Sequence, residues 1–266
     1  MAKTEVMTMR AGKPARPLVR PVTLLRVALV VGLLAGWQAL SVSGLLYRDV
    51  VPSLLAIGRA LYDTLSNGHF YFHLYTTFYE IALAMLIGGI SGLIVGLLLG
   101  ASPLLSKSFE VYLYYLGPCP KIIFFPLMLL WFGVGPGSKT AMGAISCFFP
   151  IALNAAGGMR EIDKIFISVG RSFRANTWQM VTKIYLPAMR YPIVNGIRLG
   201  LGVALIGTLL AETKLSNRGI GFLVIQAYDF FRMPEMYALL IILFVIAIGA
   251  NALIGRLGGV ESVKRA

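Results

Sequence analysis

The segment of this chain that comes nearest to a chemical motif is a glycine-rich loop at residues 133–140, which ends in Lys139-Thr140. Such loops bind nucleotide phosphates when a glycine stands directly before the lysine, because bare backbone amides can then wrap around the phosphate groups. Ser138 occupies that position here. The segment before the loop also has the length and composition of a membrane span. We therefore predict a tight turn rather than a nucleotide site.

The histidines and cysteines form no recognisable centre. His69 and His73 lie four residues apart without a convincing third metal ligand beside them, so interfacial residues are favoured over a metal pair. Cys119 and Cys147 both lie in apolar runs and lack the spacing of metal ligands, which is typical of packing residues.

Two acidic residues, Glu80 and Glu212, fall near the ends of predicted membrane spans. Ionisable groups at membrane depth are usually functional, but groups so close to an interface are alternatively just solvated. With no other constellation in the sequence, we predict that the chain is not an enzyme and has no catalytic, cofactor-binding or metal-binding residues.

The elements around these residues belong in a membrane. Of the 266 residues, 58% are hydrophobic and 13% are charged, whereas soluble domains carry about 25% charged residues. The net charge is +13, but the lysines and arginines concentrate in short loops, as cytoplasmic loops require, so no nucleic-acid partner is expected. Runs of the roughly 20 residues that cross a bilayer are predicted at about 24–46, 74–101, 109–132, 140–156, 192–211 and 236–257.

The charges of the loops orient these spans. The segments 1–23 and 258–266 are basic, whereas the loops 48–73 and 212–235 are balanced. Residues 160–190 are strongly basic. Because positively charged loops remain in the cytoplasm, the sequence predicts an all-α integral membrane protein with six transmembrane helices, cytoplasmic N and C termini, and a cytoplasmic hairpin between spans 4 and 5. The first run lacks a cleavage site and is expected to be retained as a span.

A glycine ladder runs along the second span, at Gly88, Gly92, Gly96 and Gly100. This spacing places the glycines on one helix face and lets a neighbouring backbone approach closely. Packing within one subunit is the favoured interpretation, and dimer contact or pore lining are the alternatives.

The third span is interrupted by Pro118, Pro120 and Pro126. Prolines free backbone carbonyl groups that lipid cannot satisfy, so this region is expected to face protein or a polar cavity. It is the best candidate for a translocation pathway.

The basic hairpin has the pattern of two short helices joined by an exposed turn at residues 172–177. Asn176 fits the N-cap of the second helix, with Gln179 three residues later as in a capping box. This amphipathic segment suits either a membrane surface or a groove on a protein partner. Its first helix has an apolar stripe at Ile162, Ile165, Phe166, Val169 and Phe173.

The end of the hairpin, Ile184-Tyr185-Leu186-Pro187, resembles the EAA loop of binding-protein-dependent ABC importer permeases. That pattern is Glu-Ala-Ala, three residues, Gly, nine residues, then Ile-x-Leu-Pro. Arg174 stands at the Gly position and Ser168-Val169-Gly170 at the Glu-Ala-Ala positions, so the first half has diverged. The resemblance implies contact with an ATPase through Ser168, Gly170, Arg171, Ser172, Arg174, Asn176, Thr177, Trp178, Leu186 and Pro187.

Other blocks resemble the nitrate/sulfonate/taurine branch of this family, over about residues 50–257. Glu80 stands where members of the branch commonly carry Arg, which reverses a charge near the predicted entrance. The blocks are Val51-Pro52-Ser53, 127–135 (LMLLWFGVG), Phe149-Pro150-Ile151, 196–202 (GIRLGLG), Ala211-Glu212 and 219–222 (GIGF).

The resemblance implies the permease subunit of an ATP-driven importer in the bacterial inner membrane. Residues 24–257 would form one permease domain between cytoplasmic tails, acting as a homodimer by alternating access. The implied partners are cytosolic ATPase subunits, which bind ATP and Mg²⁺, and an extracytoplasmic solute-binding protein; this chain itself is expected to bind no cofactor. The pathway candidates are Pro118, Pro120, Lys121, Pro126, Asn154 and Glu212.

The alternative is a secondary transporter or channel driven by an ion gradient. It predicts inverted repeats with paired broken helices, whereas the sequence has one proline-broken span. The solute stays open among aliphatic sulfonates, taurine, nitrate, bicarbonate and heteroaromatic or aromatic-acid nutrients, because in such systems the binding protein supplies most of the selectivity.

Overall fold

The computed structural model describes residues 21–45 and 50–257, and within these residues the chain is all helical. It divides into two units after Leu54. In the first unit, α1 (Pro21–Ser43) is a 23-residue helix that corresponds to the predicted first span. The predicted tails at 1–23 and 258–266 lie almost entirely outside the described residues.

The second unit contains the remaining elements. The π-helical segments are η1 and η3, and η2 is a 3₁₀ helix. The elements are α2 (Leu54–Ser66), α3 (Gly68–Ala101), α4 (Pro103–Leu105), η1 (Ser106–Glu110), α5 (Val111–Leu116), η2 (Lys121–Phe124), α6 (Phe125–Phe132), α7 (Pro136–Arg160), α8 (Lys164–Ser172), α9 (Thr177–Met180), η3 (Val181–Tyr185), α10 (Leu186–Ala188), α11 (Arg190–Lys214), α12 (Ile220–Asp229) and α13 (Met233–Leu257).

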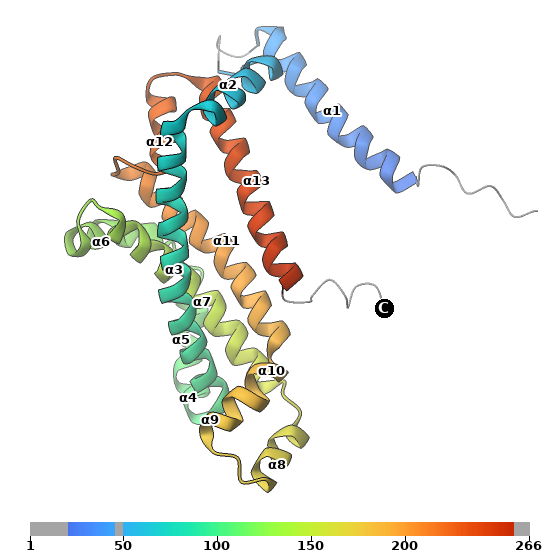
Figure 1. Cartoon of the computed structure of the whole chain (residues 1–266), viewed down its shortest axis with the longest axis vertical. Coiled ribbons are helices and arrows are strands. Elements are labelled where there is room, and N and C mark those ends of the chain that lie inside the picture. The colour runs from blue at the N-terminus through green and yellow to red at the C-terminus, as the bar shows by residue number, and fades with distance from the viewer. Residues whose placement is uncertain (1–20, 46–49, 258–266) are drawn as a thin grey trace, which may run out of the picture. The chain divides into compact units, whose positions relative to one another are not determined.

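The centre of this unit is formed by α3, α7 and α11, which lie side by side (Figure 1). The glycine ladder makes the close contact between α3 and α7 possible. A Cβ atom on Gly88 would lie 2.3 Å from the carbonyl oxygen of Ala144, and one on Gly96 would lie 2.5 Å from that of Ala152. No larger residue fits so close to a backbone oxygen. The predicted packing of the ladder within one subunit is confirmed.

The predicted third span is broken, as its prolines indicate. The segments Pro103–Leu116 and Lys121–Phe132 meet at an angle of 90°. The break contains Pro118 and Pro120, which have no N–H group to continue a helical hydrogen-bond ladder. Beyond the break, α6 runs across the direction of α3 instead of beside it (Figure 1).

Five described helices are long and apolar enough to cross a membrane, and the count rises to six if the bent pair forms one span.

Several helices begin earlier than hydropathy predicts because caps set their ends. The side chain of Asn67 accepts a hydrogen bond from the backbone of His69, so α3 begins at Gly68 instead of near residue 74. Pro136 occupies the first turn of α7. Within the balanced loop after the first span, α2 forms a short helix that begins directly after Ser53.

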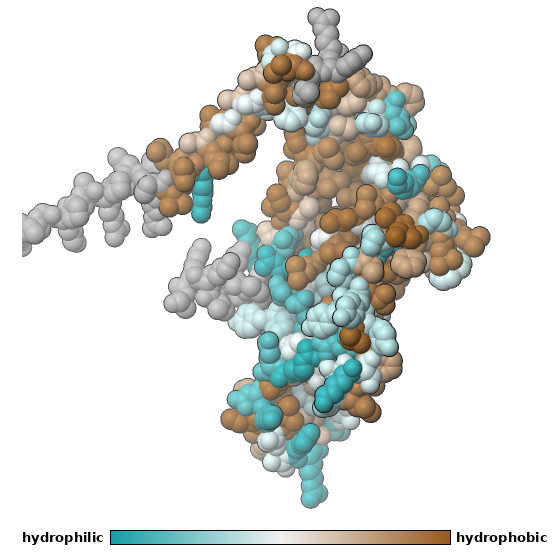
Figure 2. All heavy atoms as spheres, turned by 180° about the vertical axis from the view of Figure 1, so that it is seen from behind, coloured by the Kyte–Doolittle hydropathy of each residue, from teal (hydrophilic) through white to brown (hydrophobic). Residues whose placement is uncertain are grey.

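The two ends of the second unit differ in character. The hairpin helices α8 and α9 lie at one end, and α2 and α12 lie at the other (Figure 1). Figure 2 shows hydrophobic residues over the middle of this unit and many hydrophilic residues toward the hairpin end. This distribution suits a bundle that crosses a bilayer and extends its hairpin into water.

Candidate functional site

The hairpin between α7 and α11 turns at a residue with left-handed backbone conformation. At the end of α8, the N–H of Arg174 donates to the carbonyl of Arg171 (2.9 Å), and that of Ala175 donates to Gly170 (3.0 Å). This pair of bonds is a Schellman motif, which needs a left-handed residue at its centre. Arg174 has a φ of +53°. Glycine adopts this conformation without steric cost, so the backbone explains the glycine of the EAA pattern although the residue here is arginine.

The second half of the hairpin begins with the predicted capping box. The side chain of Asn176 accepts a hydrogen bond from the Gln179 backbone (2.8 Å), and the Gln179 side chain accepts one from the Asn176 backbone (3.0 Å). These bonds satisfy donors that the start of a helix leaves unpaired. The prediction of this box is confirmed.

The hairpin rests closely on itself and on three membrane helices. A Cβ atom on Gly170 would lie 2.4 Å from Ile184 Cδ1 and 2.6 Å from Met180 Sδ, so a larger residue fits here only if these side-chain ends shift. Beneath the hairpin, one apolar cluster connects it to α3, α7 and α11, so a displacement of the hairpin reaches all three. The cluster contains Leu93, Leu97, Ala155, Met159, Ile162, Ile167, Tyr185, Met189 and Ile193.

The outer surface of the hairpin combines apolar and basic side chains. Phe173 is 84% exposed and Trp178 is 74% exposed, and Arg171 and Arg174 are exposed beside them. The predicted apolar stripe is divided, because Ile162 is buried in the cluster below. Of the predicted coupling residues, Gly170 is buried and Leu186 is half-buried. The exposed ones are Ser168, Arg171, Ser172, Arg174, Asn176, Thr177, Trp178 and Pro187. Large apolar side chains exposed together are typical of a protein-binding surface.

A second candidate region lies at the break in the third span. A cavity of about 290 Å³ is enclosed by the break, α7 and α11, and Pro118, Pro120 and Lys121 line it. The structure therefore brings together three of the predicted pathway residues.

The other three predicted pathway residues lie elsewhere. Asn154 lines a separate cavity, where its side-chain oxygen accepts a hydrogen bond from Asn195 (2.9 Å). Pro126 is exposed on α6 and lines no described cavity. Glu212 is fully buried near the opposite end from the hairpin. The structure does not bring the six predicted pathway residues together in a single site.

The start of α12 is held by side chains from α3 and α11. The first N–H groups of a helix have no partner within it, and here three successive ones donate to other helices. They are Gly219 N to His73 Nδ1 (3.1 Å), Ile220 N to Thr77 Oγ1 (2.8 Å) and Gly221 N to Glu212 Oε2 (2.6 Å).

Two buried carboxyl groups meet in this polar cluster. Glu212 accepts a hydrogen bond from Thr77 Oγ1 (2.7 Å) and interacts electrostatically with Glu80. Glu80 is 2% exposed, and its Oε2 atom has no hydrogen-bond partner. His73 is equally buried, at 2% exposure. The alternative of solvated carboxylates is therefore wrong, because helix packing encloses both groups.

Lys139 of the glycine-rich loop belongs to the same cluster. Its ammonium donates to the carbonyls of Val134 and Leu215 and interacts electrostatically with Glu80 and Glu212. Lys139 is only 1% exposed. Its role is therefore to balance buried carboxylate charge and to hold the ends of two helices together.

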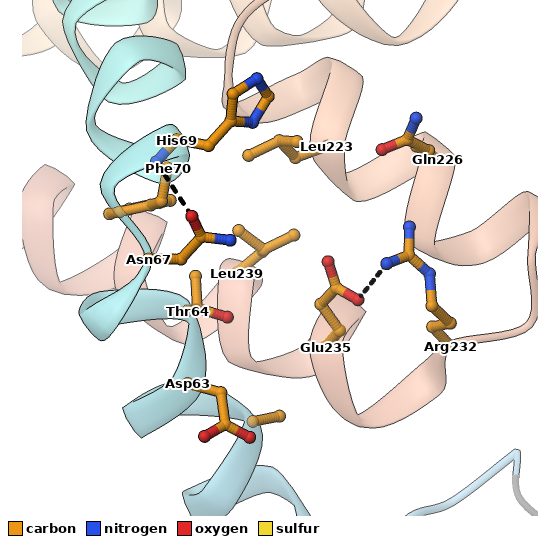
Figure 3. Close-up of a pocket in the computed structure, with 11 residues that line it drawn as sticks. Asp63, Thr64, Asn67, His69, Phe70, Leu223, Gln226, Arg232, Glu235 and Leu239 are labelled. Atoms are coloured by element: carbon orange, nitrogen blue, oxygen red, sulfur yellow. Dashed lines mark hydrogen bonds and ion pairs between the residues drawn. The ribbon is translucent and has the colours of Figure 1, made fainter.

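A further cavity of about 370 Å³ opens at the end opposite the hairpin, between α2, α3, α12 and α13. Figure 3 shows polar side chains from these helices around it, with Arg232 paired to Glu235 (2.7 Å). Asp63, His69 and Gln226 complete a rim of mixed charge and hydrogen-bonding capacity. This arrangement suits contact with a polar protein surface.

The buried cluster is the feature that the sequence reasoning missed. A signal for it exists: His73, Thr77 and Glu80 recur at four- and three-residue spacing, which places polar groups on one face of an apolar helix. The glycines at 219 and 221 are a second signal in the sequence. A Cβ atom on Gly219 or Gly221 would lie within 3 Å of Glu212 atoms.

Comparisons with known proteins identify the family of this chain. Residues 88–259 match the family described as binding-protein-dependent transport system inner membrane component. SsuC of Bacillus subtilis, a permease protein named for aliphatic sulfonates transport, is 31% identical over 80% of this chain and 78% of its own length. The taurine transport system permease protein TauC of Escherichia coli is 31% identical over 70% of this chain and 69% of its own length.

The bicarbonate transport system permease protein CmpB of Synechococcus elongatus is 28% identical over 87% of this chain and 84% of its own length. These relatives favour an importer subunit over a transporter driven by an ion gradient. The chain therefore belongs to the inner membrane components of binding-protein-dependent transport systems: it is a permease subunit of an ABC importer, a translocation component and not an enzyme, and a multi-pass protein of the bacterial inner membrane.

Proposed function

We propose that this permease moves a small solute of the sulfonate, taurine or bicarbonate kind, which a binding protein delivers from outside. The names of its relatives support this range of solutes. The observation that carries the mechanism is the hairpin α8–α9: it exposes an apolar and basic surface at one end of the bundle and rests on the cluster that joins three membrane helices.

We infer six spans with both chain termini in the cytoplasm, counting the bent pair as one span. The loop charges support this topology, because the basic hairpin then faces the cytoplasm. The polar cavity between α2, α3, α12 and α13 then faces outward, where the binding protein docks.

The coupling step follows from the contacts of the hairpin. ATP and Mg²⁺ bind to the partner ATPases, and no cofactor binds to this chain. When the ATPases close, they push on the turn at residues 172–177, and the apolar cluster carries the displacement to α3, α7 and α11. Alternating access then requires that these helices have two packed arrangements with different openings.

We further propose that two copies of the chain form the transporter and that the pathway runs between them. The exposed apolar side chains of α6 support this assembly: Leu130 is 80% exposed and Trp131 is 64% exposed. The cavity at the break would then open toward the second copy.

The experiment is ATP hydrolysis by the permease in proteoliposomes with its ATPase and binding protein, with ethanesulfonate, taurine and bicarbonate as test solutes. Replacement of residues 172–177 by glycine and serine is expected to leave the protein inserted but to abolish solute-stimulated hydrolysis. Lys107→Ser, which removes an exposed cation outside the hairpin, is the matched control and is expected to retain it. Undiminished stimulation in the turn variant, or solute uptake without any ATPase, would refute the coupling mechanism.

A further inference from the structure

Lys121 places a positive charge near the middle of α7, a helix long enough to span a membrane. Its Nζ atom lies 4.9 Å from the centre of the Phe149 ring. Phe149 is thirteen residues from the start of α7 (Pro136–Arg160) and eleven from its end. At 1.5 Å per residue these separations are about 20 Å and about 16 Å, so the ammonium lies near the midpoint of a spanning helix.

This charge has no carboxylate partner among the described residues. Among the described residues, the ammonium donates only to the backbone carbonyls of Gly117 and Cys119. Both carbonyl groups lie at the proline break, where the helical hydrogen-bond ladder is interrupted. Other cations near the bundle interior have side-chain partners: Lys139 interacts with two carboxylates, Arg160 forms an ion pair with Glu110, and Arg198 donates to the side-chain oxygen of Asn251 (2.9 Å). An uncompensated charge away from bulk water is costly, and within a membrane it marks a functional position.

The surroundings of the ammonium fit a small anion. The cavity of about 290 Å³ that Lys121 lines has otherwise mainly apolar walls, from Met142 of α7 and from Val203 and Ile206 of α11. Ser146 also lines the cavity, and its hydroxyl group donates to the carbonyl of Met142 (2.7 Å). Such a cavity offers one positive charge at one side and apolar contact for the rest of the ligand.

We propose that Lys121 is the anion-binding group of the translocation pathway, which receives solutes with one compact anionic group, of sulfonate or carboxylate type, on a small apolar body. This inference rests on the proposed function, because it places the solute in the cavity at the break. The cation lowers the electrostatic barrier to an anion at the depth where the barrier is highest, while its backbone carbonyl contacts keep the anion from binding too tightly to leave.

Cys119 provides a natural reporter for this charge. It is exposed and lines the same cavity, whereas Cys147 is fully buried. We would measure the rates at which Cys119 reacts with two thiol reagents of similar size, the anionic sulfonatoethyl and the cationic trimethylammonioethyl methanethiosulfonates. The measurement uses the full permease–ATPase complex in vesicles, without nucleotide and in the vanadate-trapped state, for the wild type, Lys121→Met and Lys121→Arg.

At about 7 Å in water, one charge changes the rate of each reagent by about threefold, in opposite directions. The ratio of the two rates then changes by roughly sevenfold or more before salt screening, and by more in a less polar cavity. The ratio of anionic to cationic reaction is therefore expected to fall at least about threefold in Lys121→Met and to be retained in Lys121→Arg. Excess sodium ethanesulfonate is expected to slow labelling of the wild type but not of Lys121→Met. An unchanged ratio in Lys121→Met, or a Cys119 that reacts in neither state, would overturn the proposal.

Hydrolysis stimulated by the binding protein in the same vesicles separates the two proposals. If the wild type is stimulated but the ratio does not depend on Lys121, the anion site is wrong and the importer mechanism stands. If the wild type is not stimulated, the importer mechanism fails, and the ratio still reports whether Lys121 attracts anions. Copurification of Lys121→Met with the ATPase verifies that this variant is folded.

Discussion

The two buried carboxyl groups, Glu80 and Glu212, should respond in opposite ways to the same substitution. Two carboxylates buried this close together repel each other, so we expect one of the pair to hold a proton. Glu212 also accepts bonds from the Thr77 hydroxyl and the Gly221 N–H, so the negative charge belongs on Glu212. Glu80, with one oxygen unpartnered, carries the proton. Glu80→Gln keeps a neutral donor, whereas Glu212→Gln removes the charge.

The magnitudes follow from these hydrogen bonds. Thr77 and Gly221 donate to different oxygens of Glu212. A glutamine at position 212 keeps only one of these oxygens, and its NH₂ group then faces the donor that has lost its acceptor. Losing one hydrogen bond to a charged group costs about 1.5–3 kcal/mol, and Lys139 also loses the carboxylate that balances it. We expect Glu212→Gln to lower the free energy of unfolding by about 2–3 kcal/mol or more. For Glu80→Gln we expect less than about 1 kcal/mol, because the hydrogen bonding of a protonated carboxyl is largely reproduced.

The assay is thermal unfolding of the purified permease in detergent, followed by the fraction that remains monodisperse after heating. For a domain of this size, 1 kcal/mol shifts the midpoint by roughly 2–4 °C, so Glu212→Gln should melt several degrees below the wild type. Glu235→Gln is the control, because it removes a carboxylate from an exposed ion pair with Arg232, which contributes little. A Glu80→Gln variant that melts as low as Glu212→Gln, or lower, would refute the assignment of the charge.

Three further substitutions test other parts of the structure. Gly219→Ala should cost more than about 2 kcal/mol in the same assay, because its φ is +100° and its Cβ atom would lie 2.3 Å from the Glu212 carboxyl carbon; a wild-type melt would contradict the buried contact. Arg174→Gly should retain solute-stimulated ATP hydrolysis and change stability by no more than about 1 kcal/mol, since glycine suits the left-handed turn; lost stimulation would show that the arginine side chain itself is needed. Gly96→Leu should prevent assembly of α3 on α7, because the new side chain would meet the Ala152 carbonyl; this is measured as the yield of folded, ATPase-bound permease, and a normal yield would contradict the packing.

The features that the sequence predicted are local or periodic. The capping box at Asn176 depends on residues three apart, and the ladder through Gly88 and Gly96 depends on one helical repeat. The break at Pro118 follows from the chemistry of proline alone. Each of these signals lies within one element, so no knowledge of the tertiary arrangement was needed to read it.

The buried cluster could not be read in the same way, because its members come from distant segments. Thr77 and Glu212 are 135 residues apart in sequence and 2.7 Å apart in space. Hydropathy places both Glu80 and Glu212 near the ends of spans, where solvation is the ordinary outcome. Only the packing of α3 against α11, and the return of the chain into α12, encloses them. The early start of α3 was missed for a related reason, since the cap at Asn67, not apolarity, sets that boundary.

The way in which α12 begins constrains how the permease can move. Its first three N–H groups are fixed to side chains of α3 and α11, and separating them would leave several buried polar groups unpaired at once. We therefore expect the start of α12 to move as one rigid body with the ends of α3 and α11 that lie away from the hairpin. Flexing is left to places where the regular helical ladder is already interrupted: the break at residues 117–120 and the π-helical segments η1 and η3. For alternating access as proposed above, we therefore expect this stiff block to rotate about the interrupted segments, rather than a single loop to open.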